Sequence, residues 1–228
     1  MLKIPIVRML LLLGVMFAVP GCAQFEETPS LKVSHLVNRA AETVNRFKTL
    51  EGLKEFAKHI PEAHAVVIFP SLIKAGFMLA GEGGSGALIV RNDAGNWGQP
   101  AFYTLGAASV GGQMGVQDTE VVLVIRSPGA LQSIMEHQGK IGADAGVTVG
   151  IYGVGVEAST TTNMNADVMA FANSRLGAFM GMSLEGAVLV TRHDLNEAYY
   201  QVGATPESIM AGNNVNPSSD ILIRALQR

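Results

Sequence analysis

The chain has 228 residues, of which 48% are hydrophobic and only 15% are charged. Lys and Arg total 16 and Asp and Glu total 19, so the formal net charge is −3 at pH 7. This length suits one domain, or two small ones, and the apolar content can fill a sizeable core. The slightly acidic balance argues against a nucleic-acid-binding protein, because such proteins carry a basic surface. We therefore predict no nucleic-acid partner.

The first segment, Met1–Gly21, has the pattern of a secretory signal, with a short basic start and then the apolar run Met9–Val19. This run is shorter than the ~20 apolar residues of a transmembrane helix. Cys22 follows directly and is the only cysteine, so it cannot form a disulfide within the chain. The sequence Val19-Pro20-Gly21-Cys22 resembles a bacterial lipobox; the alternative is a buried structural cysteine. We predict that residues 1–21 are removed and that Cys22 carries diacylglycerol and a fatty acyl chain.

Residues 22–30 then form a short polar, lipidated tether, and residues 31–228 form the folded domain. Ala23 and Gln24 follow the cysteine without an aspartate, which favours sorting to the outer membrane. The predicted location is therefore the bacterial cell envelope, with the protein lipid-anchored to the outer membrane and facing the periplasm.

A long amphipathic helix follows the tether, since apolar residues recur at helical spacing from Val33 to Phe47. Ser30 is the expected N-cap of this helix. Gly52 is expected to break it, and a second short helix is expected to end at Pro61.

Basic side chains form a stripe on the long helix. Lys32, Arg39 and Arg46 are seven residues apart, so they lie on one line beside the apolar face, and Lys48 lies close by in sequence. Basic residues at the edge of an apolar face are typical of a helix that lies on anionic lipid. The alternative is a helix that packs on the core, with the stems of these side chains covering its edge. We predict these four residues as the lipid-binding site.

From Ala63 onward the sequence predicts mainly strands and glycine turns, with one helix between the strands and further short helices toward the C-terminus. Pro70 is expected to end the first strand, and the glycine-rich segment Gly81–Gly86 is expected to be a turn between two strands. The predicted strands are Ala65–Phe69, Phe77–Ala80, Ala87–Arg91, Ala101–Leu105, Val121–Ile125, one or two within Gly142–Val156, Val168–Phe171 and Ala178–Val190. The predicted helices are Ser127–His137, Asn196–Tyr200, Thr205–Ala211 and Ser218–Arg228. The fold class is α+β: a curved, half-barrel-like, mostly antiparallel, glycine-rich sheet packed with helices from both ends of the chain.

Motifs for catalysis are weak in this sequence. Gly81–Gly86 matches G-x-G-x-x-G, but a dinucleotide site needs a helix after the glycines, and Ala87–Val90 has the composition of a strand. Ser71-Leu72-Ile73-Lys74 matches S-x-x-K, but no K-T-G or S-D-N accompanies it. The five histidines show no metal-binding spacing. We predict no enzymatic activity, no metal and no cofactor.

Eight segments, taken together and in order, resemble the SYLF family, a lipid-binding module of eukaryotic membrane and actin-patch proteins and of many bacterial lipoproteins. They cover roughly Leu31–Arg228. The segments are Ile60-Pro61, Ala65–Pro70, Lys74–Phe77, Trp97–Phe102, Gly112–Gly115, Ser174–Phe179, Gly181–Gly186 and Asn196–Tyr200. The chain departs from the family at Gly150–Gly153, where a Gly-Pro-x-Gly segment is common. The resemblance implies binding of membrane phospholipids without catalysis. Some eukaryotic members bind actin, but nothing in this sequence supports actin as a partner.

Two hypotheses follow for function. In the first, the acyl chains on Cys22 hold the protein at the membrane, and Lys32, Arg39, Arg46 and Lys48 attract anionic phospholipid head groups. In the second, lipid only tethers an envelope-organising protein or carrier, which binds a protein partner or a hydrophobic ligand through its apolar sheet.

Overall fold

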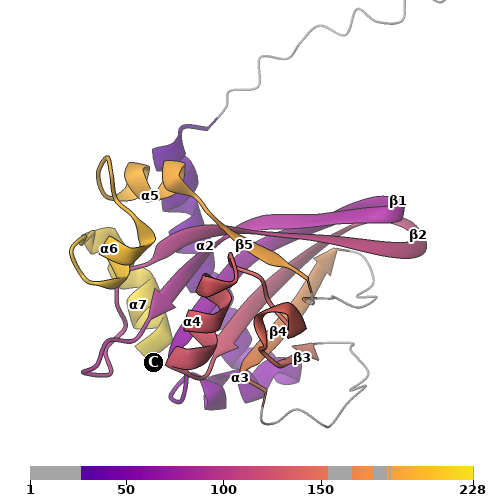
Figure 1. Ribbon diagram of the computed structural model, residues 1–228, viewed down its shortest axis with the longest axis horizontal. Helices are drawn as coiled ribbons and strands as arrows, with labels where there is room; N and C mark the ends of the chain where they lie inside the picture. The colour runs from indigo at the N-terminus through magenta and orange to yellow at the C-terminus, as the bar shows by residue number, and fades with distance from the viewer. Residues whose placement is uncertain (1–26, 154–165, 177–183, 185, 228) are drawn as a thin grey trace, which may run out of the picture.

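The computed structural model describes residues 27–153, 166–176, 184 and 186–227, and it confirms the α+β class (Figure 1). Cys22 and the signal segment lie outside these residues, as do parts of the predicted strands Gly142–Val156 and Ala178–Val190. The helices are α2 (Pro29–Thr49), α3 (Lys54–His59), α4 (Pro128–Glu136), α5 (His193–Tyr199), α6 (Pro206–Met210) and α7 (Asp220–Gln227), with 3₁₀ turns η1 (Glu51–Leu53), η2 (Ala143–Ala145) and η3 (Pro217–Ser219). The strands are β1 (Ala65–Val90), β2 (Ala101–Ile125), β3 (Val149–Gly153), β4 (Val168–Leu176) and β5 (Val188–Thr191).

The strands form one sheet in the order β1-β2-β4-β3, with β5 also paired to β2. All pairs are antiparallel except β3 with β4. The predicted mostly antiparallel sheet is therefore confirmed.

β1 is one long strand that doubles back, and two predictions about it are wrong. Pro70 does not end the strand but lies in a bulge between Phe69 and Leu72, where the register to β2 shifts. Gly81–Gly86 is not a turn, because these residues pair in register with β2.

β1 has two legs, one on each side of the register shift between Gly76 and Met78, and close contacts between these legs explain its glycines. A Cβ at Gly84 would overlap the carbonyl oxygen of Ser71, and one at Gly86 would overlap the ring of Phe69. A straight strand would separate positions 71 and 84 by about 40 Å, at about 3.3 Å per residue. The chain therefore turns back between these positions, and the register shift between Gly76 and Met78 lies there. β2 stays paired to β1 along both legs, so it follows the same bend.

The sheet has a hydrophobic core on each face. One core packs beneath α4 and α6 and includes Phe69 and Leu123. The other packs beneath α2, α3, α5 and α7 and includes Phe47 and Phe171. Burial on both faces explains why runs such as Ala65–Phe69 are continuously apolar and do not alternate. Both cores consist of residues 33–226, so a fragment that starts at Glu27 retains both cores.

The long helix predicted from periodicity is confirmed as α2, with a different cap. The Thr28 hydroxyl, and not Ser30, accepts a hydrogen bond from the N–H of Leu31, and Pro29 occupies the first turn. The predicted caps Ser127 and Thr205 are confirmed at α4 and α6. Among the described residues, no helix combines the length and apolar character needed to cross a membrane.

Candidate functional site

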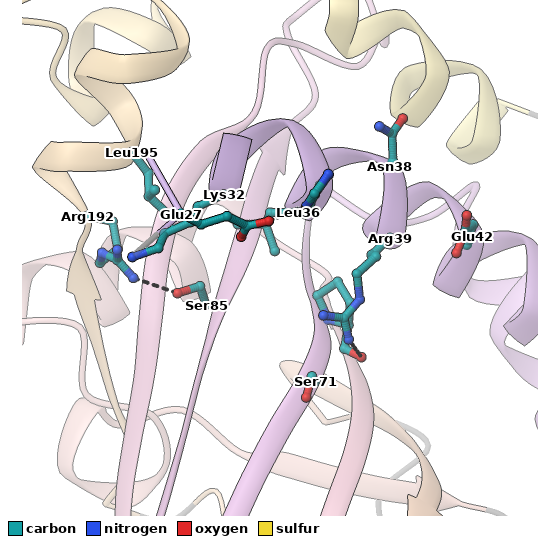
Figure 2. Close-up of a pocket in the computed structure, with 12 residues that line it drawn as sticks. Glu27, Lys32, Leu36, Asn38, Arg39, Glu42, Ser71, Ser85, Arg192 and Leu195 are labelled. Atoms are coloured by element: carbon teal, nitrogen blue, oxygen red, sulfur yellow. Dashed lines mark hydrogen bonds and ion pairs between the residues drawn. The ribbon is translucent and has the colours of Figure 1, made fainter. Parts of the chain in front are cut away.

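A surface pocket of about 520 Å³ lies between the N-terminal half of α2 and the sheet (Figure 2). Lys32 and Arg39 reach it from α2, Ser71 and Ser85 from the two legs of β1, and Arg192 from the end of β5. The bend in β1 brings the two serines to one place, although 14 positions separate them in the sequence. The remaining lining residues are Glu27, His35, Leu36, Asn38, Glu42, Pro70 and Leu195.

Two of the predicted basic residues meet at this pocket. Lys32 and Arg39 are two helical turns apart, so their side chains project from the same side of α2. Arg39 Nη2 donates a hydrogen bond to the carbonyl oxygen of Pro70 at 3.3 Å. The bulge in β1 presents this carbonyl to the helix, and the bond directs the guanidinium along the pocket wall.

Arg192 is a third cation in the pocket, and the sequence analysis missed it. It forms two bonds to the carboxylate of Asp194, at 2.8 and 2.7 Å, and donates to Ser85 Oγ at 2.7 Å. The hydrogen bonds that Arg192 donates to the Asp194 carboxylate raise the pKa of Arg192, so this group stays cationic. No spacing rule connects Arg192 with Lys32, because only the pairing of β5 with β2 carries it to the pocket.

Acidic side chains partly balance the positive charge of the pocket. Glu27 Oε1 lies 2.9 Å from Nδ1 of His35, and Glu42 lies farther along α2. Three cationic and two acidic side chains thus line the pocket. Cationic side chains and a hydroxyl of this kind suit a ligand with a phosphate or another anionic group.

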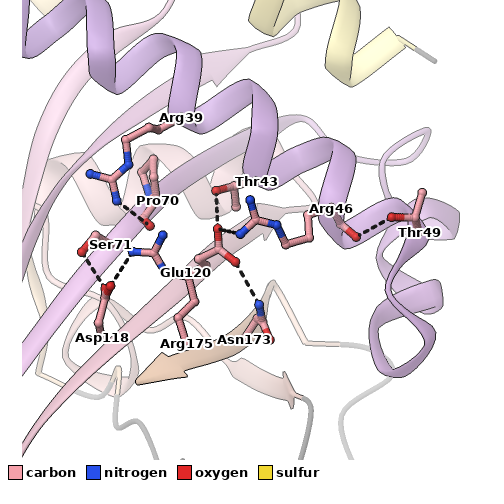
Figure 3. A network of polar contacts seen from close by, with 10 residues as sticks. All are labelled: Arg39, Thr43, Arg46, Thr49, Pro70, Ser71, Asp118, Glu120, Asn173 and Arg175. Atoms are coloured by element: carbon pink, nitrogen blue, oxygen red, sulfur yellow. Dashed lines mark hydrogen bonds and ion pairs between the residues drawn. The ribbon is translucent and has the colours of Figure 1, made fainter. Parts of the chain in front are cut away.

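Arg46, the third predicted residue, holds a buried carboxylate (Figure 3). Its Nη1 lies 2.9 Å from Oε1 of Glu120, whose side chain is 2% exposed. Thr43 donates to the same oxygen at 2.9 Å, and Asn173 donates to Oε2 at 2.9 Å. The network joins α2 to β2 and β4, so Arg46 has a structural role.

Lys48, the fourth predicted residue, faces the end of α7. Its Nζ donates to the carbonyl oxygen of Ala225 at 2.6 Å, and burial lowers the pKa of Lys48. An ammonium near the C-terminal carbonyls of a helix is favourable. Arg46 and Lys48 therefore bind groups of this chain, whereas Lys32 and Arg39 line the pocket.

A second network of polar side chains lies next to the pocket. Ser71 Oγ donates to Oδ1 of Asp118 at 2.6 Å, and Arg175 forms an ion pair with the same carboxylate. The hydroxyl of the S-x-x-K motif is thus bonded to Asp118. Within the described part of the chain, no three His, Cys, Asp or Glu side chains gather into a potential metal site.

The fold and pocket define an α+β domain built on one doubled-back sheet, with a basic surface pocket at its N-terminal helix. A family model described as "Las17-binding protein actin regulator" matches residues 106–228, which is more than half of the chain. The chain therefore belongs to the Ysc84 family, which is the SYLF family that the sequence resembles. The match contains Arg192, whereas Lys32 and Arg39 precede it.

Relatives in yeast and human support this assignment. Protein YSC84 of Saccharomyces cerevisiae is 32% identical over 161 residues, which cover 69% of this chain and 34% of the relative. LAS seventeen-binding protein 3 of the same yeast is 29% identical over 69% of this chain and 35% of its own length. The human SH3 domain-containing YSC84-like protein 1 is 28% identical over 79% of this chain and 54% of its own length. The chain thus spans between a third and about half of these relatives.

Proposed function

We propose that this domain binds anionic phospholipid head groups at a membrane surface, and that it does so without catalysis. The observation that carries the proposal is the pocket in which Lys32, Arg39 and Arg192 face the hydroxyls of Ser71 and Ser85. A head-group phosphate offers acceptor oxygens to the three cations and to the Ser85 hydroxyl, whereas the Ser71 hydroxyl donates its proton to Asp118. Guanidinium groups bind phosphate well because their N–H groups match its geometry.

The proposal narrows the binding site that the sequence predicts. Arg46 and Lys48 already bind Glu120 and the carbonyl of Ala225, so lipid would have to displace internal contacts. Lys32 and Arg39 line an open pocket, where lipid would compete with the 3.3 Å hydrogen bond from Arg39 to the carbonyl oxygen of Pro70 and not with an ion pair to a buried carboxylate. We assign the lipid-binding role to these two residues together with Arg192.

The anchor is a separate part of the proposal. Acylation at Cys22 would place lipid five residues before Glu27, which lines the pocket. Two or more chains give stable anchoring, since each buried CH₂ contributes ~0.8 kcal/mol. The lipid would then hold the domain at the cell envelope, at the outer membrane, while the pocket selects the head group.

Vesicle flotation with fragment 27–228 tests the proposal, because this fragment retains both cores and lacks the apolar N-terminal run. We expect binding to vesicles that contain phosphatidylglycerol, weaker binding in high salt, and little binding to pure phosphatidylcholine. The double variant Lys32→Glu/Arg39→Glu should bind at least roughly thirtyfold more weakly, at ~1 kcal/mol per basic residue.

The matched control is Lys54→Glu/Lys140→Glu, which makes the same charge change at two exposed lysines outside the pocket. This control should bind almost as well as the unchanged fragment. Equal retention on neutral and anionic vesicles would contradict the proposal, as would equal losses in the two double variants.

A protein partner is the second candidate function. The family description and the name of one relative refer to Las17 binding and actin regulation, which are statements about those proteins. A protein partner would fit the alternative of an envelope-organising protein or carrier. Failure of the fragment to bind any vesicle, together with cross-linking to one protein, would favour this candidate.

A further inference from the structure

The β1–β2 ribbon carries an uncovered apolar face next to the pocket. In Figure 1, β1 and β2 run together past the helices on either side. Near the end of the ribbon, where β1 bends between Gly76 and Met78, three large apolar side chains are exposed: Ile73 by 44%, Val116 by 58% and Leu176 by 57%. Such side chains, when clustered, mark interaction sites on soluble domains.

Strand register places these three side chains on one face. Ile73 pairs with Asp118, and Asp118 pairs with Leu176, so all three point the same way. Val116 is two residues from Asp118 and therefore shares that face. Glu120, two residues farther along β2, binds Thr43 and Arg46 of α2. The apolar patch is thus on the face that α2 covers elsewhere.

Several positions on this face of the ribbon are glycines, which leave the backbone of the sheet without side chains there. Ser85 faces the pocket, so Gly83 and Gly81 lie on the same face of β1, and Gly106 of β2 pairs with Gly83. A Cβ added at Gly81 or Gly106 would meet no atom within 4 Å among the described residues. A side chain at either position would therefore begin in open space.

The patch and the pocket form one continuous surface. Ser71 lines the pocket and is two residues from Ile73 on the same leg of β1. Asp118, a carboxylate beside the patch, is paired with Arg175, next to Leu176. Beyond Ser71 lie Lys32 and Arg39. The surface therefore passes from cationic groups to exposed apolar side chains, which complements the phosphate and hydrocarbon layers of an anionic bilayer.

We propose that this face of the β1–β2 ribbon, defined by Ile73, Val116 and Leu176, inserts into the interfacial layer of an anionic bilayer. This inference rests on the proposed function and adds a second contact to it. The pocket holds a head group, and the ribbon enters between neighbouring lipids. The glycine-rich part of this face, at Gly81, Gly83 and Gly106, is the surface that lies against the acyl chains.

Site-specific labelling tests the insertion. Fragment 27–228 has no cysteine, so Val116→Cys can carry a single environment-sensitive fluorophore such as NBD. The matched control is Val202→Cys, at a valine that is 90% exposed in the loop between α5 and α6, away from the end of the ribbon that projects past the helices (Figure 1). On phosphatidylglycerol vesicles, the label at position 116 should brighten about twofold or more, shift to shorter wavelength and be quenched by lipids with spin-labelled chains. The label at position 202 should not change.

A charge substitution gives a second readout. Val116→Glu should weaken vesicle binding at least about tenfold, because a carboxylate would enter the apolar layer. Val202→Glu should bind as the unchanged fragment does. Circular dichroism checks that both variants fold, and the label readout does not depend on this substitution.

The outcomes separate this inference from the proposed function. Salt-sensitive vesicle binding with a silent label at position 116 and unchanged binding by Val116→Glu would overturn the insertion and leave head-group binding intact. Absence of vesicle binding would overturn both. A label at position 116 that responds to protein concentration without vesicles, together with a doubled mass in light scattering, would show that a second copy covers the face, and would overturn the bilayer assignment.

Discussion

Replacing Arg46 with methionine tests the role that the structure gives to the α2–sheet network. The substitution keeps the apolar stem and removes the charge that faces Glu120. The Glu120 carboxylate, 2% exposed, would keep only the neutral donors Thr43 and Asn173. Breaking a buried ion pair from one side costs about 3–5 kcal/mol. Arg46 is itself 42% exposed, so water can partly replace it, and we expect a loss of about 3 kcal/mol.

The double variant Arg46→Met/Glu120→Gln identifies the cause of that loss. A glutamine at position 120 keeps an oxygen acceptor for Thr43 and removes the unpaired charge. The double variant should therefore regain most of the stability that Arg46→Met loses, to within about 1 kcal/mol of the unchanged protein. The two substitutions would then show strong coupling in a double-mutant cycle.

Urea unfolding of fragment 27–228, followed by circular dichroism, measures these free energies. Lys58→Met is the control, because the Lys58–Glu55 pair is exposed and should contribute little to stability. A loss below about 1 kcal/mol for Arg46→Met would refute the reasoning. Additive effects of the two substitutions would refute it as well, since they would show that Arg46 and Glu120 do not act as a pair.

Three other predictions concern stability and use the same unfolding measurement. Tyr199→Phe should leave stability unchanged or raise it by about 1 kcal/mol, because the buried Tyr199 hydroxyl has no hydrogen-bond partner among the described residues; a clear loss would show a hidden partner. Gly86→Ala should cost about 3 kcal/mol, because the new Cβ would overlap the other leg of β1; a neutral result would contradict the doubled-back strand. Hydrogen bonds from the N–H and hydroxyl of Thr148 lower the pKa of Asp167. The stability that Asp167 confers is therefore complete above about pH 4 and is lost as the pH falls through its lowered pKa. Thr148→Val should reduce this acid-dependent loss, and an unchanged pH profile would contradict the assignment. Two of these substitutions have a matched control. For Tyr199→Phe it is Tyr200→Phe, which removes a bonded hydroxyl and should cost about 1 kcal/mol. For Gly86→Ala it is Gly81→Ala, whose Cβ would meet open space.

The helices were predictable because their signals are local. Ser127-Pro128 and Thr205-Pro206 each place a capping hydroxyl before a proline, and both helices begin there. The apolar periodicity of α2 likewise reports the face that it buries. Thr28 was missed because its cap lies one turn before the periodic residues begin.

The long strands were less predictable because their signals depend on distant contacts. Glycines usually mark turns, so the composition of Gly81–Gly86 predicts a turn. The structure shows that at least two of these glycines, Gly84 and Gly86, are required where one leg of β1 crowds the other. A proline such as Pro70 predicts the end of a strand, yet a bulge accommodates it here.

The stripe of basic residues on α2 shows the same contrast between what local spacing predicts and what distant contacts determine. Spacing placed Lys32, Arg39 and Arg46 on one side of a helix, and that geometry is correct. Spacing could not show which partners face each residue, because those partners come from β1, β2 and β5. Arg46 meets Glu120, whereas Lys32 and Arg39 meet a pocket that Arg192 completes.

Local spacing and residue order were enough to predict the family, the α+β class, the helix positions and the basic side of α2. The bends of the glycine-rich strands, the basic residues that line the pocket and the apolar ribbon face beside it could be found only from the folded chain. These features arise where segments distant in the sequence are paired, and pairing depends on the packing of two cores against one sheet.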